Sequence, residues 1–131
     1  MSEGGKHFLD SLPSDLLSRG FWCKSEAAWS REDAVKVIEQ LSSHGLAVGG
    51  SEIWLPDEGG PEIPAPIVYT WDGPTRQPHE PWRRFVERAK EEAIKYVRSF
   101  EWDPSDAQYR SREPFFCLDF YPAENVIQHA E

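Results

Sequence analysis

Apolar residues recur at helical spacing in two stretches of the chain, Arg31–Ser43 and 82 to about 100. The first stretch follows Ser30, a residue type that caps helix N-termini, and ends before Gly45, which can supply a left-handed stop. The second stretch follows Pro81, which suits the first positions of a helix. The pattern predicts two principal helices, each of which buries its apolar face against the rest of the protein.

Four further stretches have the composition and alternation of β-strands: 46–48, 51–55, 67–71 and 115–121. Gly49 and Gly50 separate the first two and predict a turn or a bulge there. Together with the two helices, these strands predict one α+β domain over residues 1–131. Its mainly antiparallel sheet of about four strands would pack against the two principal helices.

The beginning of the chain has a weaker pattern. Residues 7–19 carry several leucines with Pro13 in their middle, which predicts one or two short helical turns interrupted at the proline. Gly20 would end this segment. Residues 21–23 follow as a short extended piece, which we expect to fill part of the core.

The charge of the chain is unevenly distributed. Its 131 residues carry a formal net charge of −9, which argues against direct nucleic-acid binding because phosphate contacts require clustered Lys and Arg. No Lys or Arg occurs between positions 45 and 75, a stretch that contains five acids: Glu52, Asp57, Glu58, Glu62 and Asp72. Such a surface either keeps the protein soluble or meets a basic partner, and its concentration in one stretch favours a partner.

The cysteines and the hydropathy of the chain indicate whether it binds metal, where it is located and whether it associates with membranes. Cys23 and Cys117 lack a CxxC spacing and a histidine at ligand distance, so the sequence predicts no metal site and no cofactor. Neither a signal-peptide core nor an apolar run of about 18 residues is present, so we expect no membrane association. We expect a cytoplasmic protein with both thiols reduced; a Cys23–Cys117 disulfide is the alternative for an exported protein.

Known catalytic motifs are missing from the sequence. It has no GxSxG elbow, no Walker-type phosphate loop and no HExxH pair, so we expect no enzyme activity. One alternative is a small-molecule binding module or minor hydrolase that uses a pocket near Trp71, Asp72 and Asp119.

We expect the partner-facing surface to combine the acids of 46–75 with the aromatic residue beside them. An aromatic side chain next to acids where a strand meets a loop is typical of an interface hot spot. The predicted partner-binding residues are Glu52, Asp57, Glu58, Glu62, Trp71 and Asp72. A different alternative is a structural subunit in which the basic face of the helix from 82, with Arg84 and Arg88, meets another acidic chain.

One longer segment resembles a known family. The segment REDAVKVIEQLSSHGLAVGGSEIWLP follows SRGFW at 18–22, and the later PIVYTWD and FFCLDF complete the pattern. This arrangement resembles a family of small immunity proteins from bacterial polymorphic toxin systems. The matching positions are Gly45, Leu46, Ala47, Val48, Gly50, Glu52, Ile53 and Trp54. The chain departs from the family pattern at Gly49, where an aliphatic residue is expected, and in its longer Pro-rich loop at 56–66.

The resemblance implies an α+β protein that binds and neutralises a cognate protein toxin and has no enzyme activity of its own. Many such toxins act on nucleic acids through basic clefts. An acidic surface on the immunity protein can imitate the phosphate backbone and speed association with a basic nuclease-type toxin.

Overall fold

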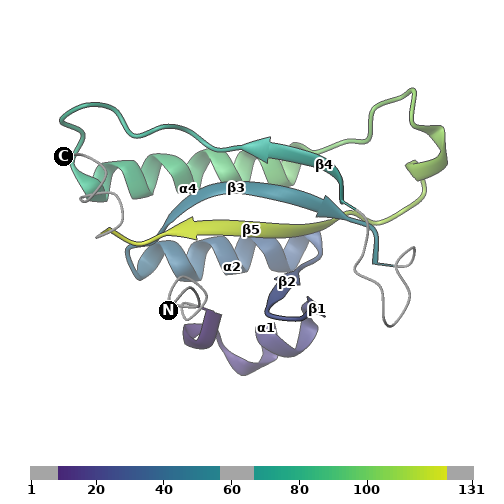
Figure 1. The fold of residues 1–131 in the computed structure, drawn as a ribbon, viewed down its shortest axis with the longest axis horizontal. Helices are drawn as coiled ribbons and strands as arrows, with labels where there is room; N and C mark the ends of the chain where they lie inside the picture. The colour runs from purple at the N-terminus through teal and green to yellow at the C-terminus, as the bar shows by residue number, and fades with distance from the viewer. Residues whose placement is uncertain (1–8, 57–66, 124–131) are drawn as a thin grey trace.

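The computed structural model describes residues 9–56 and 67–123. Within these ranges a short N-terminal helix and a hairpin precede three long strands and two long helices (Figure 1). The elements are α1 (Ser14–Arg19), β1 (Phe21–Cys23), β2 (Glu26–Ala28), α2 (Arg31–Ser43), β3 (Ala47–Trp54), β4 (Ile67–Asp72), α4 (Trp82–Ser99), a 3-10 turn (Ala107–Tyr109) and β5 (Phe115–Tyr121). The predicted α+β class and the two principal helices are confirmed.

The main sheet has three antiparallel strands in the order β4-β3-β5. The expected sheet has about four strands, but 47–48 and 51–54 of the two predicted stretches lie in one continuous strand, β3. The predicted irregularity at the glycine pair is a bulge and not a turn: the register with β5 shifts between Val48 and Gly50. The extra residue is absorbed within the strand, so the chain does not reverse there.

Helices α2 and α4 lie side by side and cover one face of the sheet (Figure 1). Their apolar stripes form the main core with one face of the strands, including the fully buried Ile38, Ile53, Val97 and Phe116. The guanidinium of Arg31, at the start of α2, donates from Nη1 to the Val97 carbonyl at 2.7 Å and the Phe100 carbonyl at 3.0 Å. The beginning of one helix thus caps the end of the other.

Both predicted boundaries of α2 are confirmed. The Ser30 side chain accepts a hydrogen bond from the Asp33 backbone N–H at 3.5 Å. Gly45 follows the helix with φ of +86°, in the left-handed region that glycine adopts without strain. The Asp33 carboxylate accepts two hydrogen bonds from Arg19, at 2.9 and 3.0 Å, and so ties α2 to the end of α1.

The sequence pattern does not predict the hairpin of β1 and β2. The extended piece expected at 21–23 is present, but it pairs with β2 and packs outside the main core. Phe21 meets Trp54 edge to face, with ring centroids 6.2 Å apart, above a small second cluster that includes Cys117. Trp22 stays 41% exposed, and neither Cys23 nor Cys117 forms a disulfide bond. The hairpin therefore covers one end of the sheet face that the helices leave open.

Candidate partner-binding surface

Three carboxylates share the open face of the sheet. Asp72 on β4 and Asp119 on β5 are both register partners of Gly50 on β3, one on each side. Directly opposed residues project to the same face, and Glu52 joins them because it lies two positions further along β3. Ile53 points the other way, into the main core. We call Glu52, Asp72 and Asp119 together the acidic sheet face.

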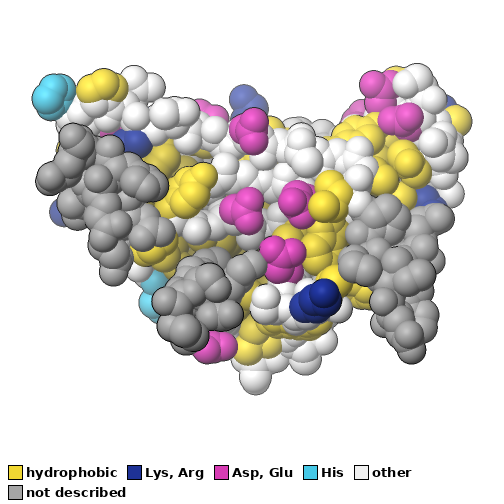
Figure 2. All heavy atoms as spheres, in the orientation of Figure 1, with side chains coloured by type: hydrophobic (Ala, Val, Ile, Leu, Met, Phe, Trp, Pro, Cys, Tyr) yellow, Lys and Arg dark blue, Asp and Glu magenta, His cyan; other side chains and the backbone are white. Residues whose placement is uncertain are grey.

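Figure 2 looks onto this face and shows acidic side chains gathered over the middle of the sheet, with hydrophobic side chains beside them. Asp72 and Asp119 are exposed and Glu52 is half-buried. Tyr121 continues the same side of β5 and is 44% exposed. Carboxylates on neighbouring strands are held at fixed spacings, so a partner meets them with little further ordering of the backbone.

Two glycines make the centre of this face flat. A Cβ on Gly50 would lie 2.7 Å from the Trp71 carbonyl oxygen, which is closer than real Cβ atoms approach backbone. A Cβ on Gly49 would lie 2.6 Å from the ring of Tyr121, which therefore rests on the main chain at that position. A side chain at position 50 would thus clash with the main chain of β4, whereas one at position 49 would displace the ring of Tyr121.

A shallow hollow lies at each end of the acidic sheet face. One, of about 410 Å³, is bordered by Asp72, Arg76 and Tyr121. The other, of about 290 Å³, lies between the hairpin and β3 and is bordered by Glu52, Trp54 and Ile67. There the indole N–H of Trp54 donates to Glu52 Oε1 at 3.2 Å, which fixes the direction of that carboxylate. Ile67 is 54% exposed at the rim and offers apolar surface beside the charge.

The predicted site residues divide into three groups. Glu52 and Asp72 are brought together on the open face. Trp71 lies on the opposite face of β4, half-buried, with its ring stacked on Tyr96 of α4 at 4.6 Å. Asp57, Glu58 and Glu62 lie outside the described residues.

Asp119 belongs to the acidic sheet face but was not among the expected partner-binding residues. Only the pairing of β5 with β3 brings it near Asp72, and register cannot be read from the alternation of one strand. None of the three hollows described among residues 9–56 and 67–123 is bordered by Trp71, Asp72 and Asp119 together. Asp72 borders the hollow of about 410 Å³ without the other two, and the Trp71 ring is stacked on Tyr96 of α4.

The basic side of α4 is partly occupied by internal contacts. Arg88 donates to the buried Glu80 carboxylate from Nε at 3.0 Å and from Nη2 at 2.7 Å. These bonds, with a third from the Gln77 backbone N–H at 2.8 Å, lower the pKa of Glu80 to about 2. Arg88 therefore anchors the loop before α4, while Arg84 is exposed.

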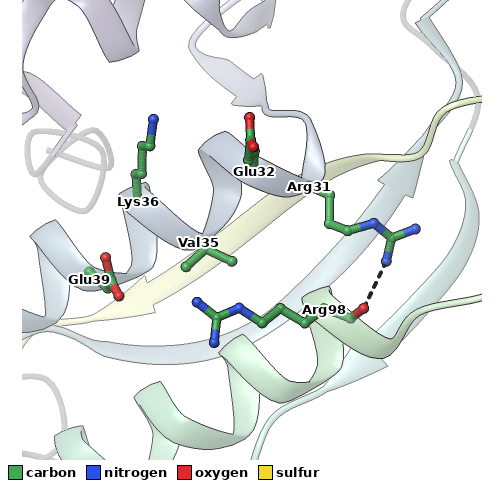
Figure 3. Close-up of a pocket in the computed structure, with 6 residues that line it drawn as sticks. All are labelled: Arg31, Glu32, Val35, Lys36, Glu39 and Arg98. Carbon is green, nitrogen blue, oxygen red and sulfur yellow. Dashed lines mark hydrogen bonds between the residues drawn. The ribbon is translucent and has the colours of Figure 1, made fainter.

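A third hollow lies on the helix layer, away from the open sheet face. It measures about 310 Å³, and its border mixes charges of both signs around Val35 (Figure 3). The other lining residues are Arg31, Glu32, Lys36, Glu39 and Arg98. Arg31 also donates to the Arg98 carbonyl at 3.4 Å. With no single sign of charge, this hollow offers less electrostatic selectivity than the acidic sheet face.

The described ranges show neither a membrane span nor a metal site. No helix in 9–56 and 67–123 is long and apolar enough to cross a bilayer. Among the same residues, no three His, Cys, Asp or Glu side chains are grouped so that they could hold a metal ion.

Comparison with known proteins adds one finding. The profile of a family described as "Immunity protein 40" matches residues 15–119, which span every helix and strand described above except the first residue of α1 and the last two of β5. A search of curated proteins and a search of solved structures each found no match.

Proposed function

The chain belongs to the immunity protein 40 family, and we propose that it binds a cognate bacterial toxin through the acidic sheet face and so neutralises it. The observation that carries this proposal is the convergence of Glu52, Asp72 and Asp119 around the flat centre at Gly50. Three carboxylates on one rigid surface create a local negative potential that attracts a basic partner and orients it during encounter.

The negative charge of the acidic sheet face suggests that the toxin has a basic binding surface. A nuclease-type toxin has a basic cleft for its phosphate-bearing substrate, and an acidic sheet face would compete for that cleft. The exposed Tyr121 and Ile67 at the two ends of the face supply apolar contacts next to the charges. Interfaces combine such anchors with polar surroundings. Neutralisation in this account needs no chemistry by the immunity protein, which would act in the bacterial cytoplasm.

The remaining predicted acids extend the proposal. Asp57, Glu58 and Glu62 follow β3 in the sequence, and we propose that they add negative charge to the same encounter surface. Reversing their charges should slow association with the toxin and weaken its salt dependence without altering the fold. Trp71 is left out of the contact surface because its ring is stacked within the helix-facing side of the sheet.

Co-expression tests the proposal. The chain is produced together with the product of the neighbouring gene, and growth rescue and co-purification are scored as the salt concentration rises. We expect rescue and a complex that weakens with salt, because exposed charges are screened within about 10 Å at 0.1 M ionic strength. A functional toxin that is neither bound nor neutralised would contradict the proposal.

A further inference from the structure

β4 is an edge strand whose outer side carries no described strand. It pairs with β3 alone, at one edge of the order β4-β3-β5. The other edge is different, because the main chain of Trp29 pairs with that of Phe116 on β5 through hydrogen bonds of 3.0 and 2.7 Å. Among residues 9–56 and 67–123, the sheet therefore has one edge that a neighbouring segment partly closes and one, along 67–72, that no strand pairs with.

The direction of the β4 main-chain groups follows from the ladder. Gly73 N–H donates to the Gly49 carbonyl at 3.0 Å, one step beyond the pair Gly50 and Asp72. In an antiparallel ladder, hydrogen-bonded and non-hydrogen-bonded pairs alternate, so Trp71 directs its N–H and C=O toward β3. Thr70 and Asp72 direct theirs outward. No described residue forms a hydrogen bond with those outward groups of Thr70 or Asp72.

The sequence of β4 does not protect this edge. Natural edge strands are commonly blunted by lysine, by proline or by an inward-pointing charge. β4 reads IVYTWD, with four β-branched or aromatic residues in succession after Ile67 and neither Lys nor Pro. Its exposed positions are Ile67, Thr70 and Asp72. An open, β-prone edge of this kind is a template for pairing with another chain.

We propose that the outer edge of β4 accepts an extended segment of the cognate toxin as a fourth strand of the sheet. This inference rests on the proposed function and specifies its mode of contact. Thr70 and Asp72 would supply backbone hydrogen bonds to the added strand. On the open face, side chains of the added strand would lie next to Asp72 and Ile67. A Lys or Arg would fit beside Asp72, and an apolar residue would fit beside Ile67.

Charge selects the toxin segment over a second copy of this chain. Two copies paired through β4 would bring two acidic sheet faces side by side on molecules that each carry a formal net charge of −9. Like charges placed on adjacent strands destabilise pairing. A basic segment instead gains attraction from Asp72 in addition to the backbone bonds.

The test combines a proline substitution with amide exchange. Thr70→Pro removes the outward N–H and fills the space that the added strand needs, while it spares the bonds to β3. Thr70→Val is the matched control, because it keeps the N–H and the β-branched shape. Affinity for the purified toxin is measured for both variants and the wild type, after circular dichroism has verified the fold. We expect Thr70→Pro to weaken binding about tenfold or more and Thr70→Val to bind within about threefold of wild type.

Amide exchange of the wild-type protein keeps the test decisive if Thr70→Pro fails to fold. Residue-resolved hydrogen exchange should slow at Thr70 and Asp72 on complex formation. Equal binding by Thr70→Pro, or unchanged exchange at both amides in a tight complex, would overturn the edge proposal and leave the proposed function standing. Loss of all binding by the wild type would instead overturn the proposed function. A wild-type dimer that Thr70→Pro dissolves would replace the toxin segment with a second copy.

Discussion

Asp72 and Asp119 lie on opposite sides of Gly50, each its register partner on a neighbouring strand. Their separation is therefore about two interstrand spacings, or roughly 10 Å, with no side chain between them on β3. Glu52 completes the group two residues further along β3. A sheet that holds three carboxylates in this way fixes the positions of its charges before a partner arrives.

Alanine should destabilise the protein more at Gly50, where its Cβ would meet main chain, than at Gly49, where it would meet a side chain. Gly50→Ala brings a Cβ to 2.7 Å from the Trp71 carbonyl oxygen, and main chain within a ladder cannot move aside. We expect the free energy of unfolding to fall by about 1–3 kcal/mol, as for other overpacked sites. Gly49→Ala meets the ring of Tyr121, which can rotate outward, so its cost should be smaller. Urea unfolding of both variants measures the difference, and equal losses would contradict this view of Gly50.

The Glu80–Arg88 pair predicts a specific acid sensitivity. The pKa of Glu80 is lowered from 4.5 to about 2, mainly by the hydrogen bonds from Arg88 and to a smaller extent by the one from the Gln77 N–H. A lowered pKa in the folded state contributes stability that is present above 4.5 and lost as the pH falls toward about 2. Glu80→Gln should therefore destabilise the protein at pH 7. Its deficit relative to wild type should shrink across that acid range.

Thermal unfolding of wild type and Glu80→Gln from pH 7 to pH 2 measures this deficit. Taking the difference between the two proteins removes the contribution of the other carboxylates. A deficit that stays constant down to pH 2 would show that Glu80 gains nothing from its ionised contact with Arg88.

Arg31 should stabilise the junction of the two helices. Its guanidinium donates to the Val97 and Phe100 carbonyls. Because α4 ends at Ser99, no following helical turn supplies N–H donors to these carbonyls. Arg31→Ala should lower the free energy of unfolding by on the order of 1 kcal/mol and speed amide exchange in the last turn of α4. Arg98→Ala is the control, because the Arg98 side chain is exposed and only its carbonyl contacts Arg31. Equal effects of the two substitutions would refute the capping role.

Much of the fold can be predicted because its periodic segments are long. α2 and α4 carry apolar stripes over several turns, and the alternation at 67–71 and the composition at 115–121 predict the strands β4 and β5. The β1–β2 hairpin could not be predicted in the same way. Each of its strands has three residues, and β2 gains its burial from Trp54 and Cys117, which are distant in the sequence. Three residues are too few to establish a period.

The candidate site was predictable in charge but not in its geometry. Glu52 and Asp72 stand out because no Lys or Arg separates them in the sequence. Asp119 joins them only through the β3–β5 register, which depends on the bulge at the glycine pair. The alternation in β4 separates two faces but does not say which face meets the helices. The stacking of Trp71 on Tyr96 settles that question and turns Asp72 outward.

The rate of association with the toxin depends on whether the acidic sheet face meets the partner. The triple variant Glu52→Gln, Asp72→Asn and Asp119→Asn removes the charges of the acidic sheet face. The control variant Glu32→Gln, Glu39→Gln and Glu91→Gln also removes three negative charges, all of them from exposed positions on the helices. Stopped-flow mixing at low salt should give about tenfold slower association, with a weaker salt dependence, for the first variant, and a rate near that of wild type for the second. Equal rates for the two variants would contradict binding through the acidic sheet face.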